Sequence, residues 1–336
     1  MKFKELWAVA FGLAGVFTNI ISPVLSYSAE AALKKVSVAY VSFSPSALWF
    51  LLEKELGYFR EEGLRPEFVL VRGGSLAVKG LMAENFDYIS NTTGAAMDAI
   101  IRGGQPLKVL LTTSMSHFWL VAQPDIRSIT DLKGKTIGIS SFGGDTDLAL
   151  REIFKRHSLD PFKDATLLVI GSSRERFAAL SSGAVHATLV SPPFNLKAVE
   201  MGYRRLAKVS DYVKWPQGGL VTKQEKVLRD TPEVSRMVRA SLKGLRVIMT
   251  QREFILARMM QMFRVGREEA IQSYEALQEG FVSPGYLAEE SERAVISLVK
   301  QAANIPDHIP PERVFDNRFV KQVEQELKGW KPQVPR

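Results

Sequence analysis

Four stretches of this sequence place glycine, serine, threonine or proline just before or at the predicted start of a helix. They hold the twelve residues that we expect to bind a ligand, which are Ser44, Pro45, Ser46, Thr92, Thr93, Ser141, Gly143, Gly144, Asp145, Thr146, Ser191 and Pro192. Free backbone N–H groups at the start of a helix bind carboxylate, sulfonate or phosphate groups without a charged side chain. These residues therefore indicate a site for a small polar solute. The alternative is that Ser44, Thr93 and Asp145 only cap their own helices.

Asp145 bears on the charge of that solute. A carboxylate in the site would repel an anion unless it capped its own helix, and it could instead accept a hydrogen bond from an amine or an aminopyrimidine. Six aromatic residues near the same loops could offer stacking surface to a heterocycle, namely Trp49, Phe118, Trp119, Phe142, Phe194 and Trp215. Because most aromatic side chains belong to protein cores, we expect about two of them to contact a solute.

Several kinds of chemistry are disfavoured by what the sequence lacks. It has no cysteine, and its four histidines, at positions 117, 157, 186 and 308, are far apart and have no metal-binding spacing. Nucleophile-elbow, Walker and dinucleotide-binding motifs are also missing. We therefore expect no catalytic residue, no metal and no cofactor. Without cysteine, neither a disulfide nor an N-terminal lipid anchor is expected.

The elements that must position the loops repeat within the chain. Residues 73–103 are faintly echoed at 172–202, with a constant offset of 99 residues. Each copy reads as a polar turn, an amphipathic helix, a short apolar strand, a hydroxyl-bearing loop and a second helix that ends at glycine. Two copies predict two similar α/β lobes. Ligands of open α/β sheets bind beyond the carboxyl ends of the strands, so the loops should face one another across a cleft.

The pattern along the chain predicts how the lobes are built. We expect residues 32–122 to form the first part of lobe 1, residues 123–218 to form lobe 2, and residues 219–336 to return to lobe 1. The segment 118–122 reads as a strand that ends the first part. Most of the last segment reads as helical and should pack on lobe 1. Two crossings between the lobes would form a hinge.

The N-terminus resembles a secretory signal peptide, which we place at 1–31. Two lysines precede an apolar stretch, and small residues then allow cleavage after Ser28 or Ala31. A permanent membrane anchor is the alternative, but polar residues at 18–19 interrupt the run that would have to span the bilayer. The expected location is therefore the periplasm.

The formal net charge is +8, but the basic residues are scattered. Groups such as Arg174-Glu175-Arg176 mix the two signs along a helix, which is typical of a solvated face. Nucleic-acid binding would need the basic residues in one patch. We expect no nucleic-acid partner.

Five motifs occur in an order that is found in one protein family. They are Glu55-Leu56-Gly57-Tyr58-Phe59 with Glu62-Gly63-Leu64, Gly73-Gly74, Gly103-Gly104-Gln105-Pro106-Leu107-Lys108, Asp131-Leu132-Lys133-Gly134-Lys135 with Ile137-Gly138, and Ala179-Leu180 with Gly183. From about Val36 to Val221 the chain resembles ABC-transporter substrate-binding proteins of the nitrate, sulfonate, taurine and thiamine-precursor class. The resemblance implies a type II periplasmic binding fold that captures a small solute between its lobes. It also implies delivery to a membrane permease with a cytoplasmic ATPase, and we expect a monomer.

Two alternatives remain open. Pyrimidine synthases of the thiamine pathway resemble this fold, but they carry a cysteine-rich stretch that this chain lacks. A solute receptor for a non-ABC transporter or a sensor is the other alternative.

One departure from the family pattern is His186, which stands where Gly-x-Val-Asp-Ala would place aspartate. This histidine could alter a contact between the lobes or be an inert surface residue.

Overall fold

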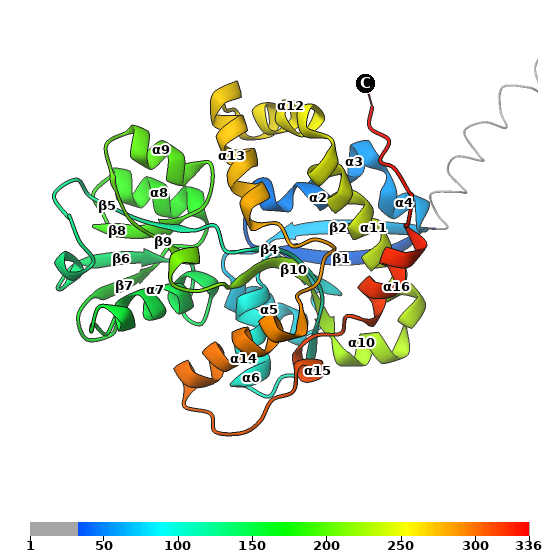
Figure 1. The fold of residues 1–336 in the computed structure, drawn as a ribbon, viewed down its shortest axis with the longest axis horizontal. Helices are drawn as coiled ribbons and strands as arrows, with labels where there is room; N and C mark the ends of the chain where they lie inside the picture. The colour runs from blue at the N-terminus through cyan, green and yellow to red at the C-terminus, as the bar shows by residue number, and fades with distance from the viewer. Residues whose placement is uncertain (1–32, 336) are drawn as a thin grey trace, which may run out of the picture.

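The computed structural model describes residues 33–335, which form two five-stranded sheets that lie side by side (Figure 1). The expected signal peptide at 1–31 lies outside these residues. The first sheet contains β1 (Lys34–Tyr40), β2 (Leu64–Leu70), β3 (Tyr88–Ser90), β4 (Leu107–Met115) and β10 (Pro216–Lys223). The second contains β5 (Trp119–Ala122), β6 (Thr136–Ile139), β7 (Thr166–Val169), β8 (Ala187–Val190) and β9 (Arg204–Lys208). Each sheet is the centre of one lobe.

The two sheets have the same topology. Their strand orders are β2-β1-β3-β10-β4 and β7-β6-β8-β5-β9. In each sheet the fourth strand runs antiparallel to both neighbours and follows a crossing between the lobes. Helices α5 (Gly74–Met82) and α8 (Ser173–Ser181) begin and end at the offset of the sequence repeat. The predicted type II periplasmic binding fold, with two similar α/β lobes, is confirmed.

The first crossing comes earlier than the sequence predicts. We expected lobe 1 to extend through Ala122, but β5 pairs with β8 and β9 of the second sheet. The chain therefore leaves lobe 1 after β4. An apolar pattern identifies a strand but does not say which sheet supplies its partners, so the boundary was wrong. The chain returns to lobe 1 through β10.

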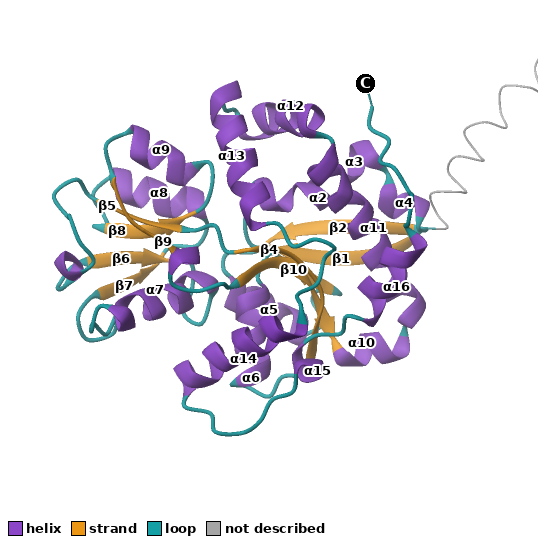
Figure 2. Cartoon of the chain, in the orientation of Figure 1, coloured by secondary structure: helices purple, strands orange, loops and turns teal. Residues whose placement is uncertain are grey.

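Helices flank both sheets, and most belong to lobe 1 (Figure 2). Lobe 1 carries α2 (Leu48–Leu51), α3 (Glu53–Leu56), α4 (Tyr58–Glu61), α5 and α6 (Thr93–Ile101), and lobe 2 carries α7 (Asp145–Arg156), α8 and α9 (Phe194–Glu200). The C-terminal part forms α10 (Gln224–Arg229), α11 (Thr231–Thr250), α12 (Arg252–Phe263), α13 (Arg267–Gly280), α14 (Glu289–Ala303), α15 (Pro311–Val314) and α16 (Arg318–Glu326). Single helical turns of the 3-10 type lie at Pro45–Ala47, Thr130–Leu132 and Val209–Asp211.

The C-terminal helices pack around lobe 1, as predicted (Figure 1). The long helix α11 contacts α2, α4 and α16. Its start is capped by the Asp230 carboxylate, which accepts a hydrogen bond from the backbone N–H of Glu233 at 3.2 Å. A Cβ atom at Gly244 would lie 2.3 Å from the carbonyl oxygen of Trp49, so only glycine allows this close approach of α11 to α2.

The two lobes pack against each other. One cluster of buried apolar side chains includes Ile100 of lobe 1 and Leu150 of lobe 2. Burial of apolar surface stabilises this contact, because it removes that surface from water. Among residues 33–335, no helix combines the length and the apolar character that a membrane span requires.

Candidate functional site

A small cavity lies between the lobes, at the carboxyl ends of the parallel strands. It is lined by Ser42 and Thr92 of lobe 1 and by Asp145 and Arg176 of lobe 2, among others, and its volume is about 30 Å³. Sites for small molecules usually measure about 300–1,000 Å³. The lobes are therefore closed over a space that is small for a ligand site.

Direct contacts between the lobes surround the cavity. The Ser75 hydroxyl donates a hydrogen bond to the carbonyl oxygen of Phe142 at 2.6 Å. The Nε atom of Arg72 lies 3.4 Å from Oε1 of Glu175. A solute can enter only if the lobes separate and these contacts break.

Thr92 is the one predicted lobe 1 residue that lines the cavity, together with its neighbour Asn91. The Asn91 amide donates a hydrogen bond to the Ser46 hydroxyl at 3.5 Å, and the hydroxyls of Ser46 and Ser44 are 3.0 Å apart. Pro45 begins the 3-10 turn that carries these serines. The predicted serines thus hold Asn91 in position and do not line the cavity themselves.

The turn before α7 carries five predicted residues, which are Ser141, Gly143, Gly144, Asp145 and Thr146. The backbone N–H of Ser140 donates to the Thr146 hydroxyl at 2.8 Å, and that of Gly143 donates to the Asp147 carboxylate at 2.7 Å. These bonds fix the shape of the turn. Of the five predicted residues, only Asp145 lines the cavity.

The remaining predicted residues lie close to the cavity. The hydroxyl of Ser191 is 3.1 Å from that of Ser173, which lines the cavity. Pro192 is joined to Pro193 by a cis peptide bond. Thr93 is buried, and its hydroxyl has no hydrogen-bond partner within residues 33–335. The structure therefore places two of the twelve predicted residues at the cavity itself.

Asp145 binds the opposite lobe, which the sequence did not predict. Its Oδ1 atom accepts a hydrogen bond from the backbone N–H of Ala95, in the first turn of α6, at 3.1 Å. The indole N–H of Trp215 donates to the same atom at 3.5 Å. Burial raises the pKa of Asp145 to about 7, although the hydrogen bonds from Trp215 and from the amides of Ala95 and Gly94 oppose this rise. Asp145 thus caps a helix, but one in the other lobe.

Arg176 is a site residue that the sequence reasoning missed. Its mixed-charge neighbourhood predicts a solvated helix face, yet only 2% of Arg176 is exposed. The Nε atom donates to the carbonyl oxygen of Leu189 at 2.8 Å, Nη2 donates to the Ser173 hydroxyl at 3.2 Å, and Nη1 donates to the carbonyl oxygen of Gly171. All three acceptors are neutral. Burial lowers the pKa of Arg176 to about 9, so at neutral pH the guanidinium is still mostly charged.

Helical spacing was the signal that could have identified Arg176. Ser173, Arg176, Phe177 and Leu180 lie three or four residues apart in α8, and all four are buried. Residues at these spacings share one face of a helix. Apolar residues at 177 and 180 therefore place Arg176 on the inner face, despite the charges on either side.

One of the six candidate aromatic residues lines the cavity, and a second contacts a residue that lines it. Phe118 lines it, and Trp215 donates to Asp145. The other four lie elsewhere: Trp49 is in the core of lobe 1, Trp119 lies beside Arg205, Phe194 packs on Phe177, and Phe142 packs on Phe162 at the surface. A heterocyclic solute would find stacking surface mainly at Phe118.

His186 has a structural role within lobe 2. Its Nδ1 atom accepts a hydrogen bond from the backbone N–H of Thr136 at 3.2 Å. At the equivalent position of the repeat in lobe 1, the Asp87 carboxylate accepts from the backbone N–H of Ser37 at 2.8 Å. A histidine nitrogen thus replaces a carboxylate oxygen in a bond that ties a loop to a strand.

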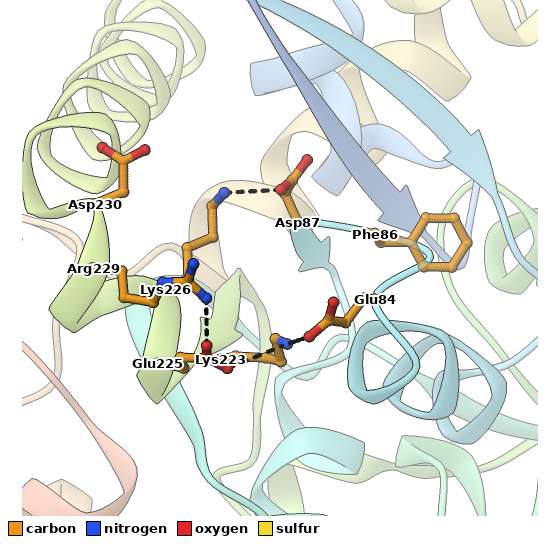
Figure 3. A pocket seen from close by; sticks show the side chains of 8 residues that line it. All are labelled: Glu84, Phe86, Asp87, Lys223, Glu225, Lys226, Arg229 and Asp230. Carbon is orange, nitrogen blue, oxygen red and sulfur yellow. Dashed lines mark hydrogen bonds and ion pairs between the residues drawn. The ribbon is translucent and has the colours of Figure 1, made fainter.

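A second cavity, of about 410 Å³, lies in lobe 1 at the opposite ends of the strands (Figure 3). Its charged side chains pair with one another. Lys226 lies 2.8 Å from Asp87, and Lys223 lies 2.5 Å from Glu84. These charges already have partners, whereas Arg176 hydrogen-bonds only to neutral acceptors. The interlobe cavity is therefore the stronger candidate for a solute site.

This chain has two lobes of the same topology that close over a small polar cavity. This arrangement is that of the two-lobed periplasmic binding folds. Residues 44–253 match the family model described as NMT1/THI5 like, and the chain belongs to that family.

One relative and two solved structures are also similar to this chain. The chain is 27% identical over 143 residues to YtlA of Bacillus subtilis (strain 168), whose name assigns it only a provisional binding role; the match covers 41% of this chain and 43% of that protein. The chain thus spans less than half of that relative.

The nitrate-binding protein NrtA from Synechocystis PCC 6803 has a TM-score of 0.72 and 14% identity over 90% of this chain and 91% of that one. The ligand-binding component of an ABC-type import system from Staphylococcus aureus has a TM-score of 0.69 and 16% identity over 86% of this chain and 99% of that one. At these identities the similarity establishes the fold alone.

Proposed function

We propose that this protein is an extracytoplasmic solute-binding protein that captures a small organic anion between its lobes and delivers it to an ABC importer. The lobes would separate to admit the solute and close over it. The site offers one cation, backbone N–H groups at helix starts, and hydroxyl groups, all of which suit a carboxylate or sulfonate. The membrane partner is a permease with a cytoplasmic ATPase, as the family resemblance implies.

The observation that carries this proposal is the buried Arg176. A guanidinium removed from water is costly unless an anion or several acceptors compensate it. Its hydrogen bonds to Leu189, Gly171 and Ser173 satisfy part of its donor capacity, and its five N–H groups exceed these three bonds. An acid group in the cavity would supply the missing negative charge in a two-point contact.

Binding is favoured over catalysis by the residues near the cavity. A pyrimidine synthase of this fold would need cysteine chemistry, and the sequence contains no cysteine. His117, near the first crossing, is partly buried, and desolvation lowers its pKa to about 4, which makes it a poor general base at neutral pH. Phe118 lines the cavity and could stack on an aromatic ring, so the acid could also be an aromatic one.

The test is a thermal-shift screen of the mature protein, unfolded and refolded to remove any carried solute. The panel contains organosulfonates, nitrate, bicarbonate, aromatic carboxylates and aminopyrimidines. A solute at a hundred times its Kd should raise the stability by about 2.7 kcal/mol. We expect the response to come from acids and not from neutral aminopyrimidines.

The variant Arg176→Met keeps the length of the side chain and removes its charge. It should lose the response to the acid that stabilises the wild type. Arg174→Met is the matched control, because Arg174 lies in the same helix but is exposed, and it should respond like the wild type. An unchanged response in Arg176→Met, or a panel in which no acid stabilises the protein, would contradict the proposal.

A further inference from the structure

The start of helix α6 is capped by the other lobe. The N-cap residue Thr92 makes no side-chain cap hydrogen bond. The first N–H groups of a helix have no partner within the helix and need an external acceptor. For α6 that acceptor is the Asp145 carboxylate, which lies 3.1 Å from the backbone nitrogen of Ala95. A lobe 1 helix is thus completed by a lobe 2 side chain.

Three separate parts of the chain meet at this carboxylate. Asp145 opens α7, Ala95 lies in α6, and Trp215 lies in the segment that returns to lobe 1. A Cβ atom at Gly94 would lie 1.8 Å from the indole nitrogen of Trp215 and 2.3 Å from Oδ1 of Asp145. Only a glycine at this position allows the lobes to come this close.

The carboxylate also occupies a position that suits a solute. The start of a helix that faces a cleft is a binding position for the acid group of a ligand. Here Asp145 fills it, and the cavity beside it has a volume of only about 30 Å³. The contacts that a bound acid would make with α6 are therefore made by the protein itself.

We propose that Asp145 is an internal ligand that latches the two lobes shut when no solute is bound. This inference rests on the proposed function, since it identifies the group with which a solute would compete for the start of α6. In such a protein the solute competes with Asp145, and only the population in which the latch is open can bind it.

Distances between two spin labels in the solute-free protein test the latch. The sequence has no native cysteine, so Lys79→Cys in lobe 1 and Thr166→Cys in lobe 2 give one label on each lobe at exposed positions. The measurement is made at about pH 6, below the pKa of Asp145 of about 7. Wild-type protein should give a single short interlobe distance.

Three substitutions in this labelled protein test whether closure depends on the hydrogen bonds that Asp145 accepts. Asp145→Ala removes the acceptor and should raise the ratio of open to closed protein about tenfold to a hundredfold, because it leaves buried donors without a partner. Asp145→Asn keeps an acceptor oxygen and should remain closed. Asp147→Asn is the matched control: its carboxylate lies in the same helical turn but bonds within lobe 2, to Gly143 and Arg151.

The latch is refuted if wild-type protein is open, if Asp145→Ala stays closed, or if Asp147→Asn opens as much as Asp145→Ala. Circular dichroism confirms that each variant is folded before its distances are compared. Since no solute is present, this result is independent of the solute screen. A failed latch would leave solute binding intact, and a failed screen would leave the latch measurable.

Discussion

Closure of the empty protein should depend on pH through Asp145. In the closed structure burial raises the pKa of this carboxyl to about 7, from an ordinary value of 3.8. When the lobes separate, the carboxyl faces water and its pKa returns toward the ordinary value. The closed state therefore binds the proton more tightly than the open state does, and a protonated Asp145 can still accept from Ala95 through its carbonyl oxygen.

The sign and size of the effect follow from this difference. Because the pKa is raised in the closed state, closure is most favourable below the ordinary pKa of 3.8 and weakens as the pH rises through about 7. Roughly three pKa units correspond to about 4 kcal/mol over the whole range. Between pH 6 and pH 8 the ratio of open to closed protein should rise about tenfold.

No neighbouring charge contributes to this shift. Its cause is burial, and the hydrogen bonds that oppose the rise come from neutral donors. On the two helices packed at the contact, Arg102 pairs with Asp98 in α6, and Arg151 pairs with Asp147 in α7. Arg176 lines the same cavity and stays charged across this range, because its pKa is about 9.

The assay is the interlobe distance of the spin-labelled, solute-free protein, measured from pH 5 to pH 9. Wild-type protein should move from closed toward open as the pH rises. Asp145→Asn has no titratable group at this position and should stay closed at every pH. Because this variant keeps all four histidines, any change with pH that it shows measures their contribution. The reasoning is refuted if the wild type shows no change with pH, or if Asp145→Asn shows the same change.

Four further substitutions test the packing. Gly94→Ala should hold the lobes open as Asp145→Ala does, since its Cβ atom would overlap Trp215, and the interlobe distance measures this. Gly244→Ala should lower the free energy of unfolding by about 1–3 kcal/mol in urea titrations, because the Cβ atom would meet the carbonyl oxygen of Trp49. His186→Ala should cost about 1 kcal/mol by the same measurement, since it removes the acceptor for Thr136, and His186→Asp should restore it.

The two-lobed fold could be predicted because the sequence repeats itself. The offset between 73–103 and 172–202 is also the offset between α5 and α8. Local patterns carry this information, since helix and strand periods are set by neighbouring residues. The boundary at Ala122 was wrong because strand pairing is decided by distant partners, and β5 finds them in β8 and β9.

The candidate site was less predictable for the same reason. Thr92 and Asp145 were identified as loop residues at helix starts, which is a local property. That Asp145 caps α6 could not be predicted, because the contact exists only when one lobe closes on the other. Arg176 was predicted to be exposed because charged residues lie on both sides of it in the sequence. The apolar residues on the same face of its helix, which indicate burial, were not considered.

The internal repeat shows where the two lobes have diverged in charge. At the repeat offset, Asp145 corresponds to Ser46 and Arg176 corresponds to Ala77. Lobe 2 therefore supplies both charged side chains of the cavity, and the lobe 1 side chains that line it, such as Ser42 and Thr92, are uncharged. A lobe with few charges can accept either Asp145 or the acid group of a solute at the start of α6. The division of charge explains how one protein could close in two ways, on itself when empty and on its solute when loaded.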